Sequence, residues 1–412
     1  MVANRVIVVG AGAAGLMAAG TAALQGAEVL VIEKNAIPAK KIRISGKGRC
    51  NITNARPIAE FIPNYPGNGK FLYSALNRFT NQDLINLLAE YGLETKVERG
   101  QRVFPVSDDA NQVADTLTSF ARTAGAEFKF NTEVQRITVS NQKVQGVVTS
   151  AGFYAADRVI IATGGSSYPR TGSTGDGYTF AKELGHTVVP LFPALVALRT
   201  QETWVQQVSG LSLKNVTAAI CCDSERHSEF GEMQFAHFGV TGPIILTLSR
   251  QAAVWLREGR KVTLSIDLKP ALSESELDKR LQSDFRKYQR KQFKNSLNDL
   301  LPKSLIPVII ELSQIPPDKQ VHQITRTERF ALIRLLKQLT LTIANTLPLS
   351  SAIVTAGGVS TAEINPKTME SKLIKGLYFA GEVIDIDGVT GGFNLQAAFS
   401  TGNAAGFHAG QG

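Results

Sequence analysis

Two short apolar runs lie near the amino terminus, with a segment of small residues between them. Residues 6–9 and 29–32 contain only Val, Ile and Leu, and residues 10–24 are rich in Gly and Ala. A short apolar run next to glycines is typical of a buried strand, and the longer small-residue segment fits a helix. The pattern therefore predicts a strand, a turn, a helix and a second strand, in that order.

The predicted turn has the spacing G-x-G-x-x-G, with glycines at positions 10, 12 and 15. In dinucleotide-binding folds these glycines permit the tight turn, the approach of a pyrophosphate and the close packing of helix on strand. The helix amino terminus favours the phosphates because its N–H groups and its dipole attract negative charge. An acidic residue ends the second strand, where it can bind a ribose diol. The predicted contacts are Gly10, Gly12, Ala13, Ala14, Gly15, Glu33 and Lys34.

A glycine-rich segment near the carboxyl end indicates which dinucleotide binds. Residues 376–396 contain a short apolar strand, a Gly-Glu turn and a glycine-rich loop, and a small-residue helix continues to about residue 406. Flavoproteins of the two-dinucleotide-binding-domain class return to FAD with such a segment, and residues 158–165 resemble their Ala-Thr-Gly loop. These segments predict FAD, with contacts from Thr163, Gly164, Gly381, Glu382, Gly391, Gly392, Asn394 and Leu395. The helix that begins near Gly392 is expected to aim N–H groups at the N1 and C2 carbonyl end of the flavin, although its glycines also suit tight packing.

A polar loop at residues 45–51 is loosened by glycines and is expected to approach a ligand. Its cations, together with Lys41, are suited to neutralise phosphates or a developing enolate, and Asn51 is suited to bond the flavin edge. The predicted contacts from this part of the chain are Lys41, Ser45, Gly46, Arg49 and Asn51, and Val134 is a further one.

Several other segments carry a narrower resemblance. They are SGKGRCNITN at 45–54, GQRVFPVS at 100–107, TGSTGDGY at 171–178, FAHFGVTGP at 235–243, TAGGV at 355–359 and PKTMESK at 366–372. In this order they resemble the BaiN/YhiN-like NAD(P)/FAD-dependent oxidoreductases over nearly the whole chain. The resemblance implies an α/β fold with a Rossmann-like FAD-binding domain of the two-dinucleotide-binding-domain class. The family includes a flavoenzyme that reduces a uridine of large-subunit ribosomal RNA to dihydrouridine.

Two residues are candidates for proton delivery in such a reduction. Hydride addition to one carbon of a C=C bond must be followed by protonation of its neighbour, and the thiol of Cys50 or the imidazole of His237 could serve as the acid. The alternative for Cys50 is a small buried packing residue, and for His237 a structural histidine at a β turn. Tyr168 and Asp176 are weaker candidates.

The flavin motifs fall at the two ends of the chain, so the middle is read as an insertion that caps the flavin. We expect a discontinuous FAD-binding domain at 1–190 plus 350–412. Alternating apolar residues predict an inserted β domain at 191–272, and helical spacing predicts a helical module at 273–349. A capping box, Thr325 with Glu328, is expected to begin one of its helices.

Charge draws attention to the helical module. The chain of 412 residues has a formal charge of +9, and residues 279–294 alone carry +6. Such a segment is either a solvated helix face or a surface that binds phosphate backbones, with interleaved Phe285, Tyr288 and Phe293 for packing or base stacking. In view of the family's RNA substrate, ribosomal RNA is a possible partner through Lys279, Arg280, Arg286, Lys287, Arg290, Lys291 and Lys294.

Composition excludes some classes and leaves others open. Three cysteines without a C-x-x-C pair indicate neither a disulfide framework nor a dithiol centre, and we expect a cytoplasmic protein with no membrane span and no metal. A second complete fingerprint is missing from the sequence, so NADPH or NADH is expected to dock only transiently. The expected function is FAD-dependent reduction of an activated C=C bond, in a ribosomal RNA uridine or in a small unsaturated carbonyl compound. A non-catalytic flavoprotein that binds a ribonucleoprotein is the alternative.

Overall fold

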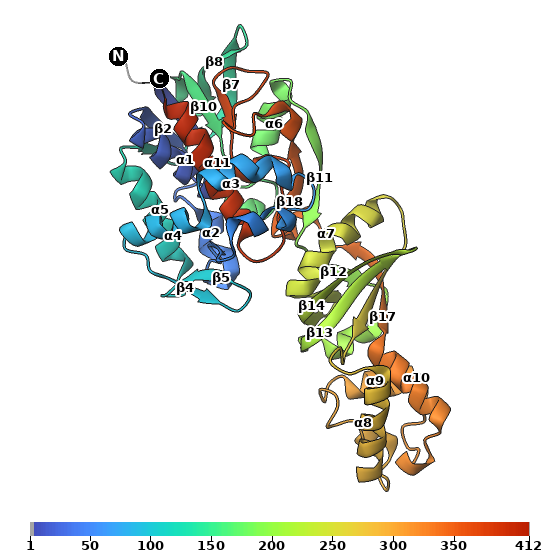
Figure 1. Ribbon diagram of the computed structural model, residues 1–412. Helices are drawn as coiled ribbons and strands as arrows, with labels where there is room; N and C mark the ends of the chain where they lie inside the picture. The colour runs from blue at the N-terminus through green and yellow to red at the C-terminus, as the bar shows by residue number, and fades with distance from the viewer. Residues whose placement is uncertain (1–3, 412) are drawn as a thin grey trace. The chain divides into compact units, whose positions relative to one another are not determined.

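The computed structural model describes residues 4–411, which divide into two compact units. Unit 1 comprises the chain up to Phe192 and from Leu349 onward, and unit 2 is Pro193–Pro348 (Figure 1). The further division of the middle segment into a β domain and a helical domain stays a prediction.

Unit 1 is built on a parallel five-stranded sheet in the order β19-β10-β1-β2-β6. Its strands are β1 (Arg5–Val9), β2 (Glu28–Ile32), β6 (Glu127–Lys129), β10 (Arg158–Ile161) and β19 (Leu377–Phe379). The predicted strand, helix and second strand are confirmed as β1, α1 (Ala13–Leu24) and β2. The predicted Rossmann-like α/β fold is therefore confirmed.

Two helices of small residues pack against each other beside this sheet. Helix α11 (Phe393–Gly410) lies along α1, and a Cβ added to Gly402 or Gly406 would lie 2.4 or 2.3 Å from the carbonyl oxygens of Ala14 or Ala18. Glycine at four-residue spacing therefore allows the two backbones to approach closely, and it joins the first and last helices of the chain.

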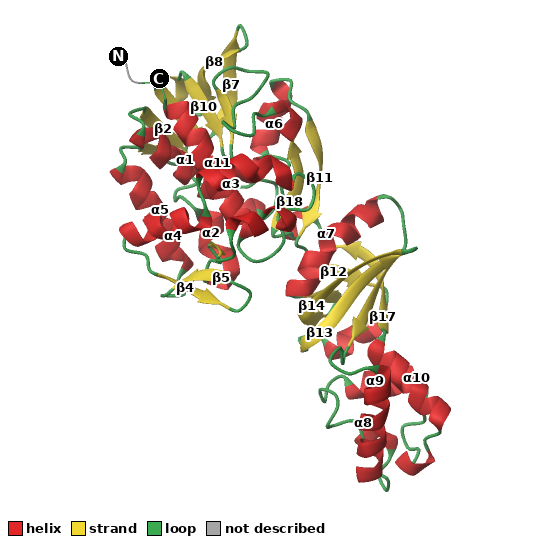
Figure 2. Ribbon diagram, viewed as in Figure 1, coloured by secondary structure: helices red, strands yellow, loops and turns green. Residues whose placement is uncertain are grey.

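Further elements of unit 1 surround the sheet (Figure 2). The helices are α2 (Lys40–Ile44), α3 (Tyr73–Arg78), α4 (Asn81–Glu90), α5 (Ala110–Thr123) and α6 (Asp176–Glu183). Two small antiparallel sheets are formed by β3 (Thr53–Asn54), β5 (Arg102–Pro105) and β4 (Thr95–Glu98), and by β7 (Val134–Ser140), β8 (Lys143–Thr149) and β9 (Gly152–Ala155). Strands β11 (Val188–Ala194) and β18 (Val354–Val359) form a pair.

Unit 2 contains a closed six-stranded barrel in the order β12-β15-β14-β13-β16-β17. The strands are β12 (Leu198–Thr200), β13 (Ser212–Cys222), β14 (Glu225–Ala236), β15 (Gly239–Thr241), β16 (Val262–Asp267) and β17 (Leu339–Thr346). The inserted β module is thus confirmed, but its last strand was predicted as part of the helical segment. Leu339, Leu341 and Ile343 alternate with exposed or half-buried residues, and this period of two is that of a strand.

The α-helices of unit 2 lie between barrel strands in the sequence. Helix α7 (Pro243–Arg257) falls inside the segment predicted as β, because Ile244, Leu248 and Trp255 recur at helical spacing and are buried. Helices α8 (Glu274–Lys287), α9 (Ile306–Ser313) and α10 (Arg326–Lys337) connect β16 to β17. The predicted capping box of Thr325 and Glu328 is confirmed at the start of α10.

Candidate cofactor site

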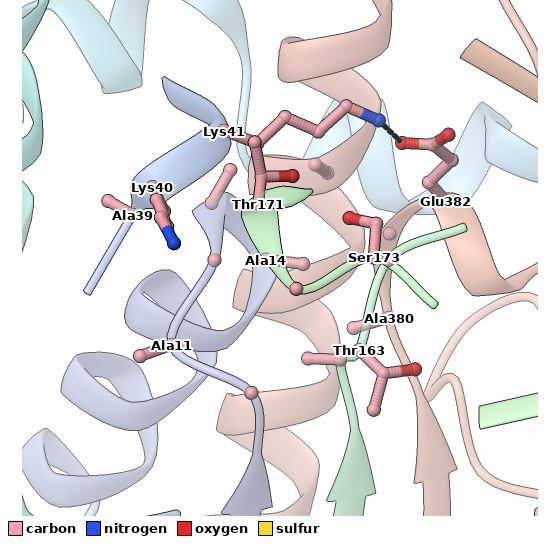
Figure 3. Close-up of a pocket in the computed structure, with 18 of the residues that line it drawn as sticks. Ala11, Ala14, Ala39, Lys40, Lys41, Thr163, Thr171, Ser173, Ala380 and Glu382 are labelled. Carbon is pink, nitrogen blue, oxygen red and sulfur yellow. Dashed lines mark hydrogen bonds and ion pairs between the residues drawn. The ribbon is translucent and has the colours of Figure 1, made fainter. Parts of the chain in front are cut away.

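An elongated cavity lies at the carboxyl ends of β1, β2 and β10 in unit 1, where open α/β sheets bind their ligands. It has a volume of about 1430 Å³, open space included, and is lined by residues from both ends of unit 1. Figure 3 shows the chain after β1 curving along this cavity with Ala11 and Ala14.

The fingerprint turn leaves its backbone accessible to a ligand. Gly10 has a φ of +101°, and its N–H donates to the carbonyl oxygen of Ile32 at 2.9 Å. A Cβ on Gly15 would lie 1.9 Å from the carbonyl oxygen of Gly10, so helix and turn require glycine there. A Cβ on Gly12 would meet no described heavy atom within 4 Å. Gly12 precedes α1 and lines the cavity, so the turn offers the open backbone that a pyrophosphate needs.

Glu33 is buried at the end of β2 and keeps an acceptor position for a ribose hydroxyl. Its Oε2 accepts the N–H of Ala11 at 2.8 Å, and its Oε1 accepts the backbone and side-chain N–H groups of Asn35 at 2.8 and 2.7 Å. An ionised carboxylate has about four acceptor positions. Three are filled by the protein, so one is left for a ligand, which fits an adenosine ribose.

An ion pair crosses the wall of the same cavity. The Nζ of Lys41 on α2 donates to Glu382 Oε2 at 2.7 Å and to Ser167 Oγ at 2.8 Å (Figure 3). Glu382 Oε1 in turn accepts the backbone N–H of Thr355 at 2.8 Å. An ammonium group has three N–H donors. Lys41 therefore retains one donor for a ligand while its position is fixed.

The glycine-rich loop before α11 is held from the side of β3. With its amide oriented to satisfy both polar atoms, Asn51 accepts the N–H of Gly392 at 3.0 Å and donates to the carbonyl oxygens of Thr53 and Val103 at 3.0 and 3.2 Å. Asn394 exchanges two hydrogen bonds of 2.8 Å with the backbone of Gly388 and lines the cavity. Asn51 thus supports the loop, and Asn394 and Leu395 bring the start of α11 to the cavity.

Most of the predicted cofactor contacts meet at this cavity. Those that line it are Gly10, Gly12, Ala13, Ala14, Glu33, Lys34, Lys41, Ser45, Val134, Thr163, Gly164, Gly381, Glu382, Asn394 and Leu395. Within residues 4–411, the lining does not include Gly15, Gly46, Arg49, Asn51, Gly391 and Gly392. The guanidinium of Arg49 instead bonds Glu98 and Asp108 and lies 4.3 Å from the centre of the Phe104 ring.

The two proton-donor candidates have different surroundings. Cys50 is fully buried, does not line the cavity among the described residues, and burial raises the pKa of its thiol to about 12. These features favour the packing alternative. His237 is exposed in unit 2, in the turn between β14 and β15.

Of the two weaker candidates, Asp176 lines the cavity. Tyr168 is not among the described residues that line it, and its side chain is exposed. Asp176 is paired with Lys34 at 2.5 Å. Tyr168 has a φ of +51°, and its N–H donates to the carbonyl oxygen of Ser350 at 3.3 Å.

Three polar residues of the site were missed by sequence reasoning. Asn35, Ser167 and Thr355 bond Glu33, Lys41 and Glu382, respectively. Thr355 lies in the TAGGV segment, and Asn35 directly follows the predicted contacts Glu33 and Lys34. Their positions in the sequence could therefore have indicated that both lie near the cofactor. Their partners are set by tertiary contacts and are not visible in the sequence.

The predicted RNA contacts lie in α8 and the turn after it, and we call them the basic surface. All of its members are exposed: Lys279, Arg280, Arg286, Lys287, Arg290, Lys291 and Lys294. Arg280, Lys287 and Lys294 pair with Asp284, Asp299 and Asp318. Phe285 and Phe293 are buried in the core of unit 2, so both pack rather than stack on bases.

The nucleotide-binding turn, the ribose acceptor and the Gly-Glu segment together define an FAD-dependent oxidoreductase with a Rossmann-like domain. The chain belongs to the family described as HI0933-like protein Rossmann domain, which matches residues 4–408. The resemblance seen in the sequence is therefore confirmed.

Two relatives of known function align with almost the whole chain. The 3-dehydro-bile acid delta(4,6)-reductase of Clostridium scindens is 34% identical over 408 residues, covering 98% of each chain. The ribosomal RNA dihydrouridine synthase of Haemophilus influenzae is 33% identical over 405 residues, covering 97% of this chain and 96% of the relative. Because such relatives are enzymes, the alternative of a non-catalytic flavoprotein is set aside.

A solved structure shares the fold at low sequence identity. The 3-ketosteroid delta1-dehydrogenase of Sterolibacterium denitrificans has a TM-score of 0.54 and 13% identity, with 99% of each chain covered. Among the residues that the structure describes, no helix is long and apolar enough to cross a membrane. The same residues contain no group of three or more His, Cys, Asp or Glu side chains arranged to hold a metal ion.

Proposed function

We propose that the protein uses bound FAD, reduced by NADPH or NADH, to reduce the C5–C6 bond of a uridine in large-subunit ribosomal RNA. The FAD cavity and the enzymatic relatives support the redox chemistry. The exposed cations of the basic surface are the main support for RNA as the substrate, and the relative from Haemophilus influenzae is named a ribosomal RNA dihydrouridine synthase. A cytoplasmic location is part of this proposal.

The reaction requires two electrons and two protons. Bound FAD would supply hydride transfer from the nicotinamide to the electron-poor carbon of the double bond, and the residues that line the cavity would hold it. The neighbouring carbon takes a proton from a protein group or from water, so that the C=C bond becomes a single bond. Cys50 and His237 are the proposed donors, and the burial of Cys50 makes His237 the first to test.

The residues of the cavity would contribute by stabilising negative charge and by holding the cofactor in position. Reduction would place negative charge on the carbonyl conjugated to the double bond and on the pyrimidine end of a bound flavin. Lys41 has a free donor for such charge, and the first N–H groups of α11 lack partners within the helix. Both are fixed by the protein before any ligand binds, so little reorganisation is needed.

The basic surface supplies electrostatic attraction without sequence specificity. The structure provides carboxylate partners for Arg280, Lys287 and Lys294, but among residues 4–411 it forms no ion pair with Arg286, Arg290 or Lys291. Cations without local partners are free to displace counterions from phosphates. We therefore expect binding that is strong at low salt and falls steeply as salt rises.

The proposal is tested by anaerobic reduction of the holoenzyme with NADPH or NADH, followed by addition of unmodified ribosomal RNA. We expect the flavin absorbance to return and the RNA to gain two hydrogens at a uridine, detected by nuclease digestion and mass spectrometry. RNA that leaves the flavin reduced and unchanged in mass would contradict the proposal.

A small unsaturated carbonyl compound is the second candidate. It is favoured by the Clostridium scindens relative, which covers 98% of this chain. The same reduced enzyme should then be reoxidised by a ring-conjugated enone and not by RNA. Comparing the two reoxidation rates on one preparation separates the candidates.

A further inference from the structure

Residues 169–176, which we call the strap, form one wall of the FAD cavity. Thr171, Gly172, Ser173 and Asp176 line the cavity, while Pro169 and Arg170 are exposed to solvent. The segment follows the Ala-Thr-Gly loop and runs into α6. Figure 3 shows Thr171 and Ser173 next to the cavity residues that come from other segments.

The strap is attached to the rest of unit 1 by few hydrogen bonds. Within residues 4–411, the bonds of its side chains and carbonyl groups to other segments come from Lys34 and Asn35. Lys34 Nζ pairs with Asp176 Oδ2 at 2.5 Å and also bonds the Thr174 hydroxyl, and Asn35 Nδ2 donates to the carbonyl oxygen of Thr171 at 3.2 Å. The other bonds of the strap are internal or belong to the start of α6.

The ends and the middle of the strap have backbone conformations suited to a hinge. Tyr168 precedes it with a φ of +51°, and Gly172 and Gly175 have φ values of +100° and +89°. A Cβ on Gly172 would lie 2.4 Å from Nδ2 of Asn35, so any larger residue at this position would displace the Asn35 side chain that holds Thr171.

Closure of the strap is coupled to the ribose acceptor. Asn35, which holds Thr171, also donates its backbone and side-chain N–H groups to Glu33 Oε1. Lys34 and Asn35 directly follow Glu33, so one short segment carries both the ribose acceptor and the attachments of the strap. A bound ribose and a closed strap therefore stabilise the same arrangement of residues 33–35.

We propose that the strap is a lid over the adenosine end of the FAD cavity and that the Lys34–Asp176 ion pair is the latch that controls FAD uptake and release. A dinucleotide buried among fixed helices and strands can exchange only if one wall moves. The strap is a wall segment held to the rest of unit 1 by few hydrogen bonds, and its latch is partly exposed, with side-chain exposures of 26% for Lys34 and 29% for Asp176.

The test measures exchange of bound FAD for radiolabelled FAD in the full-length holoenzyme. We expect Lys34→Met and Asp176→Asn each to speed release about twofold to fivefold, with uptake by the apoprotein also faster. Their double variant should be no faster than either single variant, because both remove one interaction. The charge-reversed pair Lys34→Asp with Asp176→Lys should recover slow release.

Two further variants separate the latch from other roles. Gly172→Ala changes no charge but pushes the strap from Asn35, so it should also speed release. Arg170→Gln alters the exposed side of the strap and should leave the rate unchanged. If Lys34→Met weakens FAD binding while Asp176→Asn does not change release, Lys34 binds FAD directly and the latch is contradicted.

A measurement on the unaltered protein keeps the inference testable if a variant fails to fold. Amide hydrogen exchange in residues 169–176 should slow when FAD binds and should quicken in high salt, which weakens the latch. Exchange in the strap that is insensitive to both FAD and salt would overturn the proposal, whatever the substrate of the enzyme.

Discussion

The two units of the molecule differ in the side chains through which their helices pack. In unit 1 the helices α1 and α11 meet through Gly and Ala, and the sheet ends in an open cavity. In unit 2 large side chains such as Trp255, Phe235 and Phe293 fill the interior, and the charges lie outside. The comparison teaches that small residues bring backbone to a ligand, whereas large ones build a solid support for a charged surface.

The largest expected effect comes from breaking the close packing of unit 1. Gly406→Leu places a side chain where a Cβ alone would lie 2.3 Å from the carbonyl oxygen of Ala18, so α11 must separate from α1. We expect a loss of about 3 kcal/mol or more and an apoprotein without FAD. Thermal unfolding and flavin content measure this. The control Ser283→Leu places the same side chain on the exposed face of α8 and should retain FAD.

The charged surface of unit 2 is tested by neutralising Arg286, Lys287, Arg290 and Lys291 together. RNA binding should weaken about 100-fold and its salt dependence should flatten, because each lost phosphate contact removes about one released counterion or somewhat less. Reduction of FAD should persist. The control neutralises the exposed cations Lys214, Arg226, Lys261 and Lys303. If both variants lose the same RNA affinity, RNA responds to the overall positive charge of the protein and the basic surface is not a specific binding site.

The ribose acceptor of unit 1 is tested by Glu33→Ala. FAD affinity should fall about 10- to 100-fold, since a hydrogen bond to a charged group contributes roughly 1.5–3 kcal/mol. Titration of the apoprotein with FAD measures the change. Glu28→Ala removes an exposed carboxylate from the same strand and should bind FAD normally. An unchanged affinity in Glu33→Ala, or FMN in the native protein, would contradict the assignment.

The two candidate proton donors, Cys50 and His237, lie in different units, and different results are expected when each is replaced. Cys50→Ala should leave the rate of substrate reoxidation unchanged and lower stability by about 1 kcal/mol, as a buried packing residue would. His237→Gln should slow reoxidation about 100-fold if it delivers the proton. Stopped-flow reoxidation of the reduced enzyme distinguishes them, and slow turnover in Cys50→Ala alone would restore the thiol as the acid.

The smallest effect concerns a buried histidine of unit 1. His186 Nε2 lies 2.8 Å from Ser371 Oγ, its Nδ1 has no partner among the described residues, and burial lowers the pKa of the imidazole. The unfolded chain therefore takes up the proton first as pH falls below about 6.5, so stability is full above that pH and declines below it. Melting temperatures between pH 7.5 and 5.5 should fall less in His186→Asn than in the unaltered protein.

Part of the site could be predicted because its signals are local. The strand, glycine turn and helix at the amino terminus depend on neighbours a few residues apart, and so does the capping box of Thr325. The role of Glu33 as a ribose acceptor could be predicted because this residue ends the second strand, a short way along the chain from the glycine turn. The identity of the cofactor came from motif segments at both ends of the chain, whose spacing is also read directly from the sequence.

Other features required the folded chain. Strand β17 closes the barrel only after three helices, so its pairing with β12 and β16 spans most of unit 2. Lys41 and Glu382 are 341 positions apart, and Asn51 and its partner Gly392 are separated by the same number of positions. Burial of Cys50 likewise depends on neighbours that no local pattern names.

The nucleotide-binding turn, the FAD class, the family and the excess of positive charge can be predicted from the amino-acid sequence. Which polar groups face the cavity, which bond the backbone and which cations have carboxylate partners depend on the folded chain. The physical reason is the distance along the chain over which each interaction acts. Periodicity, capping and turn formation act over a few residues, whereas burial and ion pairing depend on atoms that only folding brings together.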